Sequence, residues 1–364
     1  VKLEETIKNL TEIINSKKRL AEVVKGELND VKRRHKDLRR TVIKNNEDDI
    51  TVASSDDEKP IVNYVLGYSG KGLVRKVKLM SYSRSKIDAP TPAEIFLFDV
   101  NVSSNETIYA FTDKGNIFRI IPDNVPEARG AGQGGVSFDS LFKEAQKGEI
   151  PVAFFNIKDK LDGNVIMFTK NGVVKKLAWE ELVKFSRSST SVINLKEGDS
   201  VVCVEIDEEN KNLFYVTLKG IALHSVKEVS VYGKNAGGIK GISLDDGDSV
   251  IYATQVDDDV DTEILCATSF GTFVRRFVGN VRVIGRGGRG VKLVDLGDKK
   301  FNECVVFAKC IKQNDNGILT VVDRMGVVSH ASIKDVSSNT KAGKGVSIAK
   351  LGVIQPLTVY CVRQ

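Results

Sequence analysis

The sequence is poor in the residues that define several classes of protein. It has 5 cysteines, an odd number with no Cys-x-x-Cys pair, and only 3 histidines, which lie far apart. These numbers argue against a disulfide framework and against a clustered zinc site. No apolar run reaches the roughly 18 residues of a membrane span, and no signal peptide opens the chain. We expect a cytoplasmic protein with reduced, buried thiols and no contact with membrane.

The basic excess is confined to the N-terminal segment. The net charge is +6, yet residues 1–44 hold 13 Lys and Arg against 7 Asp and Glu, so residues 45–364 hold 41 of each sign. A nucleic-acid surface on the larger part would therefore need segregated charges rather than overall basicity. The length of 364 residues allows more than one domain.

Residues 1–44 are predicted to be helical. Leu3, Ile7, Leu10 and Ile14 form one apolar stripe, Leu20, Val24, Leu28 and Val31 form a second, and Ser16 is placed to cap the second helix. We expect an amphipathic helix pair that packs on another part of a longer protein. The acidic, Ser-rich residues 45–60 end in proline and are predicted to be a linker.

From residue 61 onward, short β-rich runs alternate with turns, and six nine-residue segments repeat. They are YSGKGLVRK (68–76), FTDKGNIFR (111–119), FTKNGVVKK (168–176), VTLKGIALH (216–224), ATSFGTFVR (267–275) and VDRMGVVSH (322–330). Each has a central glycine between apolar runs, as in a hairpin whose turn needs positive φ. The glycines are 43 to 57 residues apart, which leaves room for four strands per repeat. The sequence therefore predicts an all-β, six-bladed β-propeller over 61–364.

A basic or titratable residue stands four positions after each of these glycines. The six are Lys76, Arg119, Lys176, His224, Arg275 and His330. Equivalent positions of a propeller lie on a ring, and a ring of cations would suit a polyanion. Charged ends of edge strands, which protect against aggregation, would give the same pattern. The spacing leaves both interpretations open.

Glycine-rich loops follow several hairpins. They are ARGAGQGG (128–135), GKNAGGIKG (233–241), GRGGRG (285–290) and KAGKG (341–345), whereas repeats one and three carry SRSKIDAPT (83–91) and SRSSTS (186–191). None matches GxxxxGK[ST] between a strand and a helix, which argues against a nucleotide site. Because glycine lets backbone amides approach phosphates closely, these loops are candidate phosphate cradles. The alternative is a solvated connection between strands.

Residues 17–43, which end in RRTVI, and the six repeats together resemble the C-terminal part of the A subunit of bacterial type IIA topoisomerases, gyrase and topoisomerase IV. The resemblance implies a six-bladed β-pinwheel that bends DNA around its rim, preceded by the end of the coiled-coil and dimerisation region. The implied partners of the parent enzyme are double-stranded DNA, an A-subunit homodimer and a topoisomerase B subunit. ATP and Mg²⁺ are implied only for that parent. The family's catalytic tyrosine and metal site belong to regions absent here, so no catalytic residue or cofactor is carried over.

The resemblance also implies which residues contact DNA. From the hairpins these are Lys76, Arg119, Lys175, Lys176, Arg275 and Arg276. From the loops they are Arg129, Lys234, Lys240, Arg286, Arg289, Lys292, Lys341 and Lys344.

The chain departs from the gyrase pattern in the first repeat. Gyrase A subunits carry a box of the form QRRGGKG after the first hairpin, where this chain has SRSKIDAPT without glycine. GRGGRG is closest to the box but lies in the fifth repeat. The departure favours a topoisomerase IV-like protein that does not wrap DNA, with a wrapping gyrase domain as the alternative.

Two other function classes compete with DNA binding. A protein-interaction propeller would use the glycine loops as connectors, and the acidic VDDDVDTE (256–263) would repel DNA unless it lay away from the DNA path. A propeller enzyme is disfavoured because no acid/base pair with a nucleophile stands out.

Overall fold

The computed structural model describes residues 1–35, 60–84, 88–128, 132–156, 163–185, 187–257, 261–297, 302–339, 343–348 and 356–363. The chain divides into two compact units, residues 1–59 and 60–364, close to the predicted linker. No helix in the described ranges is long and apolar enough to cross a membrane.

The N-terminal unit contains two helices, α1 (Lys2–Asn15) and α2 (Lys17–Arg34). The predicted cap is confirmed, because the Ser16 Oγ accepts a hydrogen bond from the Arg19 amide at 3.3 Å. Neither helix has a buried residue. The apolar stripes are exposed, with Ile14 at 79% and Leu28 at 63%.

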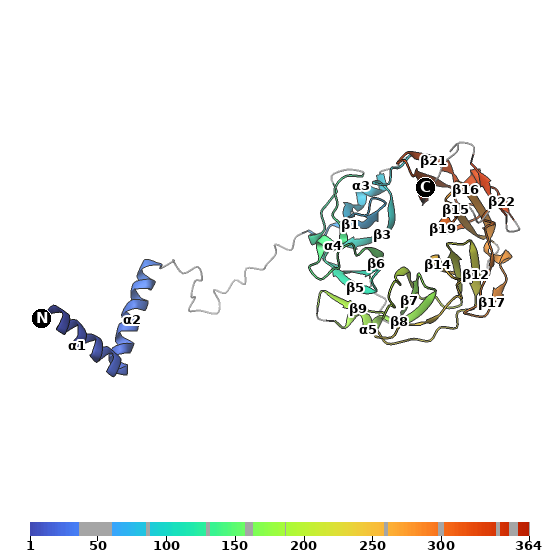
Figure 1. The fold of residues 1–364 in the computed structure, drawn as a ribbon. Helices are drawn as coiled ribbons and strands as arrows, with labels where there is room; N and C mark the ends of the chain where they lie inside the picture. The colour runs from blue at the N-terminus through green and yellow to red at the C-terminus, as the bar shows by residue number, and fades with distance from the viewer. Residues whose placement is uncertain are drawn as a thin grey trace, which may run out of the picture. The chain divides into compact units, whose positions relative to one another are not determined.

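The C-terminal unit is a ring of six antiparallel-hairpin sheets, as predicted (Figure 1). Blade 1 holds β1 (Asn63–Ser69), β2 (Val74–Lys78) and β3 (Phe96–Ser103). Blade 2 holds β4 (Ile108–Thr112), β5 (Asn116–Ile120), β6 (Pro151–Asn156) and β9 (Ser189–Ser191). Blade 3 holds β7 (Asn164–Thr169), β8 (Val173–Ala178), β10 (Val201–Ile206) and β13 (Ile239–Lys240). Blade 4 holds β11 (Asn212–Thr217), β12 (Ile221–Ser225), β14 (Val250–Val256), β17 (Val283–Ile284) and β18 (Val291–Lys292). Blade 5 holds β15 (Thr262–Thr268), β16 (Thr272–Phe277), β19 (Val305–Lys312), β22 (Ser338–Asn339) and β23 (Val346–Ser347). Blade 6 holds β20 (Gly317–Asp323), β21 (Val328–Ser332) and β24 (Pro356–Arg363).

Short helices lie in the connections between these strands. They are α3 (Leu79–Arg84), η2 (Pro122–Asn124), α4 (Phe138–Leu141), α5 (Trp179–Val183), η3 (Val278–Asn280) and η5 (Ile333–Asp335).

The turn glycines behave as the sequence predicts. All six, from Gly72 to Gly326, have φ between 74° and 81°. Each hairpin also pairs, through its first strand, with the last strand of its own repeat, which lies on the inner side of the ring, as β14 and β19 do in Figure 1. Five apolar clusters fill the space between consecutive blades from 1 to 6.

The outer strands differ from the expected four strands per repeat. β17 and β18 follow the fifth hairpin, yet they pair with β12 of the fourth hairpin. We call this pairing of an outer strand with the hairpin of the preceding repeat the strand exchange. It also joins β9 to β5, β13 to β8, and both β22 and β23 to β16. Each glycine loop therefore covers the preceding blade, and this exchange ties neighbouring blades together.

Blades 6 and 1 close the ring through polar contacts. The Tyr360 hydroxyl donates to the Gly70 carbonyl at 2.9 Å. The Pro90 carbonyl lies 3.1 Å from His330 Nε2 and accepts from the Thr320 hydroxyl at 3.3 Å.

Candidate nucleic-acid interface

The basic or titratable side chains that stand four positions after the turn glycines are mostly engaged inside the propeller. At four of the six equivalent positions the side chain meets a backbone carbonyl just after the next hairpin: Lys76 with Pro122 at 2.7 Å, Arg119 with Val183 at 2.7 Å, His224 with Val281 at 3.0 Å and His330 with Pro90 at 3.1 Å. The periodic basic residue thus links one blade to the next around the ring.

Lys76 shows how complete this engagement is. Its side chain is 7% exposed, its Nζ lies 4.7 Å from the centre of the Tyr64 ring, and Asp123 lies 3.8 Å away. Arg119 stacks on Phe185 at 4.2 Å. A buried cation surrounded by carbonyl oxygen and an aromatic face is satisfied without an external anion.

Lys175 and Lys176 have different internal partners. The Lys175 ammonium is fully buried and donates to the carbonyls of Val192, Lys234 and Ala236 at 2.7 to 2.9 Å. Burial lowers the pKa of Lys175 to about 8. Lys176 pairs with Asp207 at 3.1 Å. Burial alone would raise the pKa of Asp207, but hydrogen bonds from two lysines lower it.

The two arginines of the fifth hairpin are also buried. Arg275 pairs with Glu263 and donates to the Gln313 carbonyl at 2.6 Å. Arg276 donates to the carbonyls of Asn280 at 2.9 Å and Lys292 at 3.4 Å, and burial lowers its pKa. The six Lys and Arg residues predicted as hairpin contacts with DNA therefore make contacts within the fold. The solvent-facing Lys and Arg side chains must be sought in the loops.

The loop cations are more accessible. Lys240, Arg289, Lys292 and Lys344 are exposed, and Lys234 and Arg286 are half-buried. Arg129 and Lys341 lie outside the described residues, as do three residues of the acidic stretch 256–263.

Backbone hydrogen bonds connect successive outer loops into one chain of segments, which we call the rim belt (187–194, 232–243, 283–295 and 343–348). The Asn194 amide donates to Ala236 at 3.3 Å, Gly287 to Gly241 at 2.7 Å, and Asp295 to Gly343 at 2.9 Å. β9 and β17, which belong to the belt, lie along the outer side of the ring in Figure 1. The belt thus brings together loop cations that are up to 110 residues apart in sequence, from Lys234 to Lys344.

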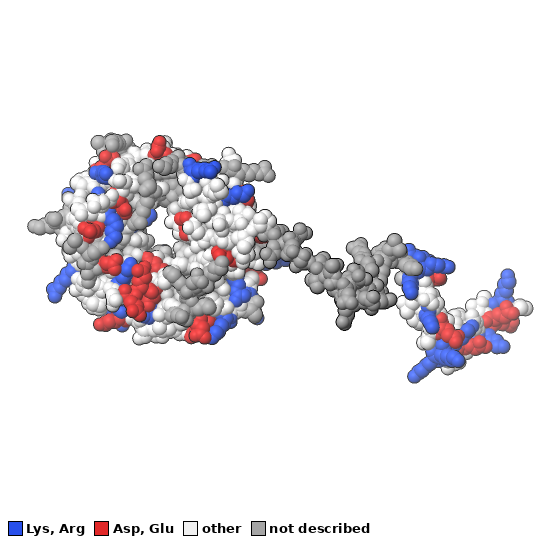
Figure 2. Space-filling view, turned by 180° about the vertical axis from the view of Figure 1, so that it is seen from behind, with Lys and Arg blue, Asp and Glu red and all other residues white. Residues whose placement is uncertain are grey.

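Arg286 fixes the junction of two belt segments. Its Nη1 donates to the Lys240 carbonyl at 2.6 Å and its Nε donates to the Glu228 carbonyl at 3.0 Å. Arg289 and Lys292 follow on the same loop, where Lys292 pairs with Asp295 at 3.0 Å. Figure 2 shows both basic and acidic side chains on one face of the ring, in keeping with the balanced charge of this part.

Four glycines of the outer loops, three of them in the belt, have a structural requirement that sequence reasoning missed. Gly135, Gly238, Gly290 and Gly345 have φ between 75° and 109°, and each precedes a valine or isoleucine. A Cβ on Gly290 would lie 2.4 Å from the Ala222 carbonyl oxygen. Only glycine lets the belt approach the preceding hairpin this closely. The repeated Gly-Val or Gly-Ile pair was the available signal.

The described residues hold no group of three or more His, Cys, Asp or Glu suited to a metal ion. The five cysteines are free, and burial raises the pKa of Cys310 to about 12. The Cys310 thiol is therefore a poor nucleophile.

Comparison with known proteins agrees with this architecture. The profile of the family described as "DNA gyrase C-terminal domain, beta-propeller" matches residues 163–205, 225–257 and 262–305. The A subunit of DNA gyrase from Staphylococcus epidermidis is 26% identical over 360 residues, which cover 96% of this chain and 39% of that protein. The A subunit of DNA gyrase from Staphylococcus aureus (strain MRSA252) is 26% identical over 362 residues, which cover 95% of this chain and 39% of that protein. The chain is thus similar to gyrase A subunits along nearly its whole length.

Solved structures confirm the fold of this gyrase A-like pinwheel. The C-terminal domain of a DNA topoisomerase IV gives a TM-score of 0.69 at 22% identity, covering 83% of this chain and 94% of that one. A DNA gyrase A C-terminal domain gives a TM-score of 0.58 at 17% identity, covering 82% of this chain and 98% of that one. The chain spans 39% of the length of the gyrase subunits it matches.

Proposed function

We propose that the pinwheel is a non-catalytic domain that binds and bends duplex DNA. It would present the duplex to the catalytic core of a parent type IIA topoisomerase for ATP-dependent strand passage. The observation that carries the proposal is the rim belt. Hydrogen bonds between neighbouring loops place the exposed Lys240, Arg289, Lys292 and Lys344 on one continuous outer path.

Phosphate contact explains how such a path would act. Cations and glycine amides neutralise phosphates without reading bases, so binding should be nearly independent of sequence and should weaken with salt. Following a curved path requires the duplex to bend, at a cost that depends on how deformable its sequence is. The buried hairpin cations would hold the belt in place rather than touch DNA.

Charge-neutralising variants test the proposed path. Arg289→Gln and Lys344→Gln should each weaken DNA binding and reduce the slope of log affinity against log salt by about 1. Lys211→Gln is the matched control, since Lys211 sits in the turn between β10 and β11 and already pairs with Glu208 and Asp257. Equal effects of the control and the belt variants would contradict the proposal.

We propose topoisomerase IV-like decatenation and relaxation for the parent, because the first repeat lacks a glycine loop. The gyrase alternative has its own support, since the relatives quoted above are gyrase A subunits. A linking-number assay separates them: the chain is bound to nicked circular DNA, the nick is ligated, and the topoisomers are resolved. A large shift of constant sign indicates gyrase-like wrapping, and a small shift with salt-sensitive binding indicates bending alone.

The parent's partners belong to the same proposal. An A-subunit homodimer and a topoisomerase B subunit would assemble through the rest of the parent, which would also supply ATP and Mg²⁺ chemistry. A protein-interaction propeller is the rival, and it predicts that the belt variants bind DNA as the unmodified chain does.

A further inference from the structure

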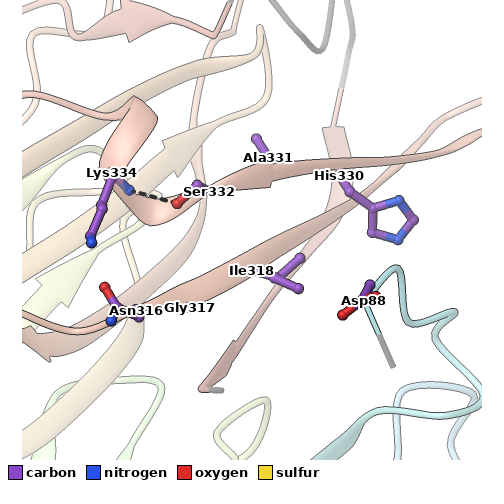
Figure 3. A pocket seen from close by; sticks show the side chains of 8 residues that line it. All are labelled: Asp88, Asn316, Gly317, Ile318, His330, Ala331, Ser332 and Lys334. Carbon is purple, nitrogen blue, oxygen red and sulfur yellow. Dashed lines mark hydrogen bonds between the residues drawn. The ribbon is translucent and has the colours of Figure 1, made fainter. Parts of the chain in front are cut away.

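Two pockets of the pinwheel differ in the charge of their linings. One, of about 450 Å³, opens beside the β20–β21 hairpin, and its charged residues are Lys334 and Asp88, one of each sign (Figure 3). The other, of about 600 Å³, lies next to β5 and β9, on the outer side of the ring in Figure 1. This second pocket, which we call the blade 2 pocket, has an excess of positive charge.

Three cations and one carboxylate line the blade 2 pocket. The cations are Arg119, Lys143 and Arg187, and the carboxylate is that of Glu144, which leaves a formal charge of +2. Lys143 and Arg187 are exposed, and within the described ranges their side chains have no ion pair or hydrogen bond. Arg119 binds the Val183 carbonyl through Nη2, but its buried Nε has no hydrogen-bond partner among the described residues.

The opposite part of the lining is apolar. It includes Ile121, Leu141 and Phe142. Ile121 is 52% exposed, so part of this apolar wall is open to solvent. Phe142 is held in place by ring contacts with Phe118 and Phe138, at centroid distances of 4.7 and 5.3 Å. The pocket therefore joins a fixed apolar wall to a cluster of cations.

Contacts between repeats build the pocket into the fold. The strand exchange pairs β9 with β5, and the Arg119 amide donates to the Ser188 carbonyl at 3.0 Å, which places Arg187 at the pocket. The Asp139 carboxylate accepts from the Gly148 amide at 3.0 Å and ties down the turn that carries Lys143. A largely apolar cavity of this size with a few convergent polar groups is typical of a small-molecule site.

We propose that the blade 2 pocket binds a small phosphate monoester with a planar, apolar body. A phosphate monoester carries a charge of about −1.5 to −2 at pH 7, which matches the +2 of the lining. Arginine and lysine are the usual partners of phosphate, and the apolar wall would bury the ring. The site goes beyond DNA binding, because the phosphates of a duplex would have no use for an apolar wall.

Calorimetric titration of the full chain tests this site without DNA. Naphthyl phosphate is the probe, and it should bind with a Kd below about 1 mM. Inorganic phosphate has the charge without the ring, and naphthol has the ring without the charge. Each should bind at least about tenfold more weakly than naphthyl phosphate.

Variants of the two exposed cations complete the test. Lys143→Gln and Arg187→Gln should each weaken the binding of naphthyl phosphate about tenfold. Lys147→Gln is the matched control, since Lys147 is exposed on the same connection but does not line the pocket. Unchanged affinity in both pocket variants would overturn the proposal. Equal binding of inorganic phosphate and naphthyl phosphate would also overturn it, since it would indicate an adventitious ion only.

The salt dependence of DNA binding separates this site from the rim belt. Lys143 lies outside the belt, so Lys143→Gln should leave the slope of log affinity against log salt unchanged. A shallower slope would place the pocket on the DNA path and overturn the proposal of a separate site. A failure of naphthyl phosphate to bind would leave the DNA-binding proposal intact.

Discussion

Gly290→Ala should destabilise the pinwheel by about 3 kcal/mol. A non-glycine residue in the left-handed region costs about 1 to 2 kcal/mol, and Gly290 has φ of 75°. The new Cβ would also lie 2.4 Å from the Ala222 oxygen and 2.9 Å from its carbonyl carbon, both of which are backbone atoms. To relieve this steric clash, β18 would have to move away from β12. That movement would weaken main-chain hydrogen bonds between the two strands, which are worth about 1 kcal/mol each.

Gly285→Ala is the control in the same loop. A Cβ on Gly285 would meet no atom within 4 Å, and the backbone there does not have a positive φ. Its substitution should change stability by less than about 0.5 kcal/mol. Urea unfolding followed by circular dichroism gives both values, and a lower midpoint at unchanged slope identifies lost stability. Equal midpoints for the two variants would refute the packing role of the belt glycines.

Two further predictions concern buried charges. Lys175→Met leaves three carbonyls without their donor and should cost about 2 to 4 kcal/mol of unfolding free energy. Because the folded pKa of about 8 lies below the unfolded value, the cost of charging Lys175 is present below pH 8 and disappears as pH rises toward about 10.4. The unmodified chain should therefore gain stability relative to Lys175→Met across that window, and a constant difference in urea unfolding would contradict this. Glu263→Gln removes the partner of buried Arg275 and should cost about 3 kcal/mol or more, so a loss below about 1 kcal/mol would contradict the pairing.

The hairpins could be predicted because their signal is local. A turn with positive φ requires glycine, and the apolar runs flank it within nine residues, so Gly72 and its five counterparts stand out at regular spacing. The outer strands could not be predicted from the sequence, since β17 and β18 are two residues long and pair with a hairpin of the preceding repeat. A segment of two residues carries no detectable hydrophobic period.

The candidate site was predictable only in part. Sequence spacing places Lys76 and Arg289 equally well on a rim, because a cation that binds a carbonyl and one that faces solvent look alike in sequence. The structure separates them: Lys76 binds the Pro122 carbonyl, whereas Arg289 is exposed. Which carbonyl a cation meets depends on the exchange between repeats, and that is a property of tertiary structure.

The salt dependence of DNA binding is the measurement that tests phosphate contact by the rim belt. A fluorescent duplex is titrated with the full chain at several salt concentrations, and log affinity is plotted against log salt. Phosphate binding by the rim belt predicts a linear decline, with a slope of about −0.9 for each phosphate neutralised. The slope should become shallower in Arg289→Gln and not in Lys211→Gln. An affinity that stays constant between about 50 and 200 mM salt would contradict phosphate binding by the rim belt.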